Sequence, residues 1–165
     1  MSDAAPQQAA PLVVNLQYIR DLSFEAPGAP AIFSSLTGQP QVRINLDVQA
    51  RRLEENQPQF EVSLVIRVEA HEMLGESEQG RTVFLADLTY AGMFTLSGIP
   101  ADQMEPVLLI ECPRLLFPFA RNILADVTRD GGFPPVLLQP IDFVALWHSR
   151  RAAEQQAAQG PVGHA

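Results

Sequence analysis

Few side chains in this sequence could take part in chemistry, and they lie far apart. His71 and Glu72 could form an acid/base pair, but neighbouring residues of a strand point to opposite faces, so the two cannot act on one substrate atom. His148 lies beside Trp147 on an expected helix, and His164 lies near the end of the chain. Three separated histidines do not form a metal site, so we expect no metal.

Cys112 is the only cysteine, so the chain cannot form an internal disulfide or a cysteine-based zinc site. It precedes a proline in an apolar stretch, where a buried, inert thiol is far commoner than an activated nucleophile. Gly131 and Gly132 follow an expected helix, which suits a helix end and not a phosphate-binding loop. We therefore expect a protein that is not an enzyme and uses no cofactor.

The 165 residues, of which 47% are hydrophobic, suffice for one domain with a core. A net charge of −8, with eleven arginines and no lysine, argues against nucleic-acid binding. The single cysteine favours a reducing compartment, and no run resembles a signal peptide or membrane span. We expect a cytoplasmic protein without direct membrane insertion, with flexible tails at residues 1–11 and 152–165 around a domain at 12–151.

Period-two alternation of apolar and polar residues predicts four strands, at about residues 14–18, 42–48, 60–70 and 81–96. Short, turn-rich links between the last three favour antiparallel hairpins. Gly92 interrupts the fourth strand, where we expect a bulge or bend.

Helices are expected in the second half of the chain. Asp102 could cap the first, and the two prolines of CPRLLFPF should break it before a second helix at 119–128. The last helix should begin at Asp142 as N-cap and end at Arg150 and Arg151. Strands followed by helices predict an α+β fold with the helices on one face of the sheet.

Apolar residues occupy both faces of the expected strands, as Val65 and the alternation of Leu85 with Phe84 show. An antiparallel sheet covered on one side should have a polar outer face. The excess apolar surface could be buried between copies of the chain, or could form a groove for apolar ligands or unfolded chains. The two explanations are compatible, and both stay open here.

Four blocks resemble the SecB family of export chaperones, in order and spacing. They are DLSFEAPGAP at 21–30, FLADL at 84–88, AGMFTLSGI at 91–99, and the long block from CPRLLFPF to DFVALW at 112–147. The resemblance implies a four-stranded antiparallel sheet with helices on one face, assembled as a dimer of dimers. It also implies a chaperone that holds precursor polypeptides unfolded without ATP and delivers them to the motor SecA. The alternative is a small-molecule-binding or enzymatic domain that uses an apolar groove.

The resemblance also assigns roles to residues by motif position. SecA contact is implied for Asp21, Glu25, Leu85 and Asp87, and contact between subunits for Ala86, Leu88 and Tyr90. Binding of unfolded clients is implied for Phe33, Leu36, Val42, Ile44, Leu46, Phe84 and Phe119. Two departures matter: Asp87 stands where glutamate is usual, and Leu36 is nearest to a position where many relatives have tryptophan. The plainer interpretations are sheet core for Val42, Ile44 and Leu46, and simple solvation for the acidic residues.

Overall fold

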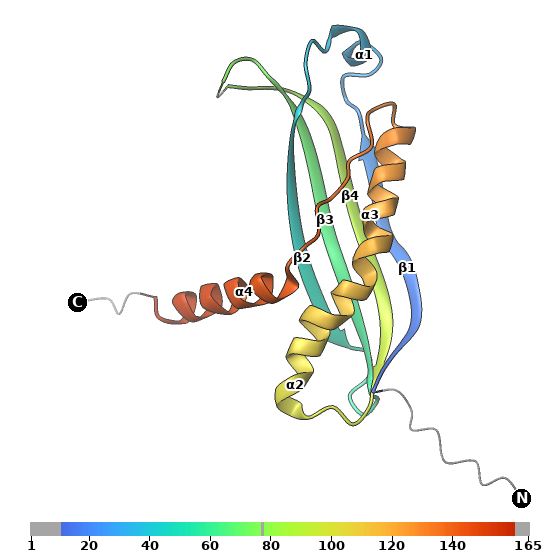
Figure 1. Cartoon of the computed structure of the whole chain (residues 1–165), viewed down its shortest axis with the longest axis vertical. Coiled ribbons are helices and arrows are strands. Elements are labelled where there is room, and N and C mark those ends of the chain that lie inside the picture. Colours follow the sequence, from blue (N-terminus) through green and yellow to red (C-terminus); the bar gives the residue numbers. More distant parts are fainter. Residues whose placement is uncertain (1–10, 77, 161–165) are drawn as a thin grey trace, which may run out of the picture.

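A single antiparallel sheet forms the body of the molecule, in a computed structural model that describes residues 11–76 and 78–160. Its strands are β1 (Leu12–Glu25), β2 (Gln41–Arg52), β3 (Gln59–Met73) and β4 (Gln79–Leu96). They lie in the order β1-β4-β3-β2, so β1 and β2 are the two edges (Figure 1). The expected four-stranded antiparallel sheet with helices is confirmed.

One helical arm crosses a face of the sheet. It consists of α2 (Ala101–Pro106), a π-helical segment η1 (Val107–Glu111) and α3 (Cys112–Asp130), which follow each other without a gap (Figure 1). The expectation that prolines break this arm is wrong. Pro113 directly follows the π-helical segment η1, where the regular hydrogen-bond pattern is already interrupted, and Pro118 lies inside a helix that packing on the sheet supports.

The ends of the helices follow the sequence only in part. Asp102 lies in the first turn of α2 and not at its cap, which is Pro100 without a side-chain bond. Gly131 ends α3 as expected. Asp142 caps α4 (Phe143–Ala158) as expected, and its carboxylate accepts a hydrogen bond from the Ala145 N–H at 3.0 Å.

The last helix is longer than the sequence suggested. It continues past Arg151 to Ala158, because alanine, glutamate and glutamine favour helix. The expected C-terminal tail is therefore helical over 152–158, while residues 1–10 and 161–165 lie outside the described part of the chain. This helix projects away from the sheet beside β2 (Figure 1). No helix in the described part is long and apolar enough to cross a membrane.

The core lies between the sheet and α3. Even-numbered residues of β3 and β4, such as Leu64 and Leu88, face the helix and are buried with Leu116 and Leu124. Gly92 is in register with Val62 on one side and Gln17 on the other, so the expected bulge at this glycine is wrong. The irregularities of β1 lie between Val14 and Leu16 and between Ile19 and Asp21.

Gly92 instead lets the helix approach the sheet closely. A Cβ atom at this position would lie 2.8 Å from Leu116 Cδ2 and 2.7 Å from Phe94 Cε2. Glycine is thus required by packing between the layers and not by the course of the strand.

Candidate functional site: an apolar groove and an acidic patch

An open groove of about 440 Å³ lies between the segment that follows α1 (Ile32–Ser35), the edge strand β2 and the segment that follows α3. Of the side chains that line it, only that of Gln39 is polar. The groove residues are Leu36, Gly38, Gln39, Pro40, Val42, Ile44, Phe84, Phe133, Pro134, Pro135, Val136 and Leu137. Such a lining favours apolar groups and offers no acid or base for catalysis.

Aromatic rings form one end of this groove. Phe133 lies 5.0 Å from Phe84 and 5.1 Å from Phe33 between ring centroids, and Phe84 stacks on Phe24 at 5.7 Å. Pairs at this spacing stabilise each other beyond the area they bury. Phe33 nevertheless keeps 50% of its surface exposed, so one face of the cluster remains open to a ligand.

The segment 133–142 crosses the sheet beside α3 and forms one wall of the groove (Figure 1). Thr128, at the end of α3, ties it down. Its buried hydroxyl donates to the Leu124 carbonyl at 2.8 Å and accepts from the Val136 N–H at 3.0 Å. A segment with three prolines has few backbone donors, so this bond fixes the wall at one point.

An ion pair connects the β3–β4 hairpin to α1 near the groove. Arg81 Nε donates to Glu72 Oε2 at 2.8 Å, and Arg81 Nη2 donates to Ser35 Oγ at 3.1 Å. The hydrogen bond and charge of Arg81 lower the pKa of Glu72. Glu72 therefore has a structural partner on the β3–β4 hairpin, which agrees with the expectation that His71 and Glu72 do not work together.

Four of the seven residues expected to contact clients line this groove: Leu36, Val42, Ile44 and Phe84. Phe33 adjoins it through Phe133. Leu46 packs half-buried against the core, and Phe119 lies on α3, where it stacks on Tyr90 at 6.3 Å. The structure therefore does not bring Leu46 and Phe119 into the groove lining.

Sequence analysis missed the wall at 133–137. These residues belong to the long block at 112–147, and their paired prolines are a sign of an extended segment. Nothing in the local pattern shows that this segment runs across the sheet, because its position depends on packing against distant residues, such as that of Phe133 on Phe84 of β4.

The four residues expected to contact SecA come together on the face of the sheet that α3 does not cover. Glu25 stands opposite Leu85, and Asp21 stands opposite Thr89, the residue two positions from Asp87 on the same strand face. Arg67 of β3 also lies here, with its Nε 3.9 Å from Asp87 Oδ1 and 2.7 Å from Glu69 Oε1. We call Asp21, Glu25, Leu85 and Asp87 the acidic patch.

The residues expected to contact another subunit have little exposed surface in the single chain. Ala86, Leu88 and Tyr90 are 0%, 1% and 7% exposed within the single chain, because α3 covers them. Period two correctly put them on the other face from Asp87, but that face is covered by a helix of the same chain. The part of these three residues in assembly stays a prediction.

The remaining reactive side chains have structural surroundings. Burial, together with the neighbouring Glu111 carboxylate, raises the pKa of Cys112 to about 12, so the thiol stays protonated, as expected for an inert cysteine. His71 is buried, with its Nε2 3.6 Å from Glu69 Oε2. The described residues contain no cluster of three side chains that could hold a metal ion.

A buried carboxylate lies on the same face as the acidic patch. Glu61 is 3% exposed and contacts Tyr18, Arg20 and Arg51. Burial opposes its ionisation, but the hydrogen bonds from Tyr18 and Arg51 and the arginine charges outweigh this, so the pKa of Glu61 is lowered. The group ties β1, β2 and β3 together.

Comparison with known proteins gives a consistent result. The family model described as "Preprotein translocase subunit SecB" matches residues 5–155. The protein-export protein SecB of Granulibacter bethesdensis is 64% identical over 159 residues, which cover 96% of this chain and 93% of that protein. That of Acidiphilium cryptum is 62% identical over 154 residues, with 89% and 93% covered.

A solved structure shares the fold. It is a SecB-like chaperone of Mycobacterium tuberculosis in complex with a peptide from the HigA1 antitoxin. The TM-score is 0.64 at 14% identity, over 81% of this chain and 93% of that one. At this identity the likeness supports the architecture alone.

The Thr128 bond can be tested by removing its hydroxyl. Thr128→Val keeps the shape but leaves the Val136 N–H without its acceptor, so we expect unfolding to become easier by about 1–3 kcal/mol. Hydrogen exchange at the Val136 amide should also accelerate. Thr128→Ser is the control, because it keeps the hydroxyl and loses only a methyl group. Equal exchange at Val136 in both variants would show that the bond does not hold the groove wall.

Proposed function

Because the chain belongs to the SecB family of protein-export chaperones, we propose that its groove holds precursor polypeptides in an unfolded state without nucleotide. The main support for this site is the groove itself, which is open, apolar and bordered by the sheet edge β2. Unfolded chains expose apolar side chains that folded proteins bury. A ligand of that kind matches the groove without any special sequence.

Holding needs no chemical step. A protein that binds the unfolded state and not the native one shifts the folding equilibrium by mass action alone. If several grooves belong to one assembly, a long client can engage them together, and its affinity can exceed that of one groove by about 10²-fold or more. Selection then favours polypeptides that remain unfolded long enough to be caught.

The alternative, a small-molecule enzyme that uses the same groove, has little support. The groove lining contains no ionisable side chain, Cys112 is buried, and Glu72 is paired with Arg81. A general acid or base must reach the substrate within hydrogen-bonding distance. We therefore place no reaction in the groove.

We infer that the acidic patch docks the motor SecA. Asp21, Glu25 and Asp87 share one face of β1 and β4, which presents several carboxylates to a basic partner. The net charge of −8 adds a long-range attraction for a basic partner. Arg67 reduces the local charge near Asp87, so Asp21 and Glu25 should carry more of the recognition than the sequence alone suggested.

We further propose a cytoplasmic homotetramer, a dimer of dimers, with its first contact at β1. This edge strand is long, and its side chains leave a row of apolar residues at least 37% exposed: Val13, Val14, Leu16, Ile19 and Leu22. An uncovered edge of that kind favours pairing with another chain. The exposed apolar residues of α3, Leu115 and Phe119, offer a second surface for assembly.

Holding can be tested in the groove itself. Ile44→Asp and Leu36→Asp put a charge among apolar groups, so we expect about tenfold more chaperone to be needed to suppress aggregation of a denatured, unrelated polypeptide. Val144→Asp is the control, because Val144 is exposed on α4 and outside the groove lining. If both groove variants suppress aggregation as well as the parent chain, clients bind elsewhere.

Docking of SecA can be tested by removing charge without changing shape. Glu25→Gln and Asp87→Asn should each lower SecA affinity by about fivefold at low salt, with the larger loss at Glu25, and leave client holding unchanged. The difference should shrink near 0.15 M salt, where the screening length is about 8 Å. Glu55→Gln, in the β2–β3 turn, is the matched control. Unchanged SecA affinity of both patch variants at low salt would remove the docking assignment.

Assembly through β1 can be tested by sedimentation. Ile19→Arg and Leu22→Arg should convert the assembly into smaller species, since an unpaired charge in an interface is costly. Leu74→Arg, on the β3–β4 hairpin, is the control, because Leu74 is an exposed apolar residue outside β1. A stable monomer of the unmodified 18.1 kDa chain at micromolar concentration would contradict the tetramer.

A further inference from the structure

The outer edge of β2 has a definite pattern of free backbone groups. At the β2–β3 turn, Leu53 N donates to Gln59 O at 3.0 Å, and the β2–β3 register places these two residues opposite each other. In an antiparallel pair, hydrogen-bonded and non-hydrogen-bonded pairs alternate. The odd-numbered residues of β2 therefore bond to β3. The even-numbered residues turn their N–H and C=O groups to the open edge: Val42, Ile44, Leu46, Val48 and Ala50.

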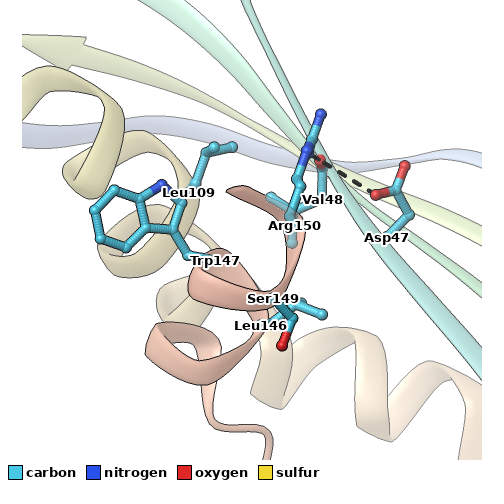
Figure 2. A pocket seen from close by; sticks show the side chains of 7 residues that line it. All are labelled: Asp47, Val48, Leu109, Leu146, Trp147, Ser149 and Arg150. Atoms are coloured by element: carbon cyan, nitrogen blue, oxygen red, sulfur yellow. Dashed lines mark hydrogen bonds and ion pairs between the residues drawn. The ribbon is translucent and has the colours of Figure 1, made fainter. Parts of the chain in front are cut away.

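One side chain occupies this edge. Arg150 Nη1, from α4, donates to the Val48 carbonyl at 2.6 Å, which confirms that this carbonyl points outward. The same guanidinium group lies 3.9 Å from Asp47 Oδ1 and 3.2 Å from Glu154 Oε1. Figure 2 shows the Arg150 side chain extending from α4 to the strand, next to Asp47 and Val48.

Contacts between α4 and the helical arm hold α4 in this position, and they surround a hollow of about 370 Å³. The hollow is lined by Leu109 of the helical arm and by Leu146 and Trp147 of α4 (Figure 2). Trp147 Nε1 donates to Glu105 Oε1 at 3.4 Å, and Arg151 lies 5.1 Å above the indole ring. The contact of Arg150 with Val48 is therefore set by a docked helix.

On the other side of Val48 the edge is free. Within the described ranges, no hydrogen bond outside the sheet ladder reaches the backbone of Val42, Ile44 or Leu46. Val42 and Ile44 also line the apolar groove, and both are about 40% exposed (39% and 42%). Free backbone groups and an apolar wall thus lie side by side over the same stretch of strand.

We propose that an extended client segment pairs with β2 along Val42–Leu46 as an additional strand, and that Arg150 ends this pairing at Val48. The proposal rests on the function proposed above and names how the groove takes its ligand. Backbone pairing supplies affinity that is independent of sequence, while alternate side chains enter the groove. The occupant is an extended polypeptide, because only a backbone of that form matches alternating donors and acceptors along an edge.

Arg150 gives the pairing a fixed end on β2. A strand that continued past Leu46 would need the Val48 carbonyl, which the guanidinium already occupies. Displacing a charged donor from a carbonyl costs more than breaking a neutral hydrogen bond. Client segments should therefore end their pairing there, and the rest of the client is left free for other grooves.

The pairing can be tested with a capped peptide of alternating apolar and polar residues, long enough to span β2 at ~3.3 Å per residue. Two derivatives carry N-methyl groups on alternate amides. One is methylated at the odd-numbered residues of the peptide and the other at the even-numbered residues. The alternation of side chains fixes which face enters the groove, so the peptide cannot slip by one residue. We expect one derivative to bind the full chain like the parent and the other about tenfold more weakly, and peptide binding should slow hydrogen exchange in β2.

The role of Arg150 can be tested with two capped peptides, one of about five residues and one of about nine. Arg150→Met keeps an unbranched apolar stem but removes the guanidinium donors, so affinity for the longer peptide should rise about fivefold, with no change for the shorter one. Arg151→Met is the control, because Arg151 stacks on Trp147 and not on β2. Far-ultraviolet circular dichroism checks that α4 remains helical.

Each outcome decides between the possibilities. Equal binding of both N-methylated peptides, or binding without slower exchange in β2, rules out strand pairing while leaving the chaperone function intact. A gain for both peptide lengths, or for neither, rules out Arg150 as the end point. Concentration-dependent protection of β2 without peptide would show that a second copy occupies the edge. Failure to bind either peptide or to suppress aggregation would reject the proposed function as well.

Discussion

The contact of Leu116 with the sheet at Gly92 determines how the layers of this molecule lie on each other. A side chain at Gly92 would force Leu116 or Phe94 to shift within the packed core, so glycine favours this close approach of the helix. Anchored there, α3 covers β4 and much of β3, where the fully buried core residues lie. The edge strand β2 is left without a helix above Val42 and Ile44, and the apolar groove is the space that remains.

The alternation of side chains along β4 separates two surfaces that would otherwise compete. Phe84 and Leu88 point toward α3 and the groove, whereas Leu85 and Asp87 point to the uncovered face. Charge therefore collects on one side of the sheet and apolar surface on the other, with only a sheet's thickness between them. The buried Glu61, held by Tyr18 and two arginines, braces three strands on the charged side.

Sequence analysis predicted what local patterns determine and failed where distant parts of the chain decide. Period two located all four strands, and Asp142 was correctly expected to cap α4. Pro118 was expected to break a helix that packing on the sheet maintains. Leu88 was assigned to the right face of its strand, but a pattern cannot say whether a helix of the same chain or another subunit covers that face. The groove wall at 133–137 lies where Phe133 packs on Phe84 of β4, a contact between distant residues that no local signal shows.

Trp147 is the only tryptophan, and it lies where α4 meets the helical arm, between Glu105 and Arg151. Intrinsic emission of the protein excited at the red edge of the indole band therefore comes from this single junction. Because the groove lining contains phenylalanine but neither tryptophan nor tyrosine, a bound peptide without tryptophan adds no overlapping emission, even when it carries an acceptor dye. The fold thus contains a built-in optical probe of α4, separate in position from the surface on which clients bind.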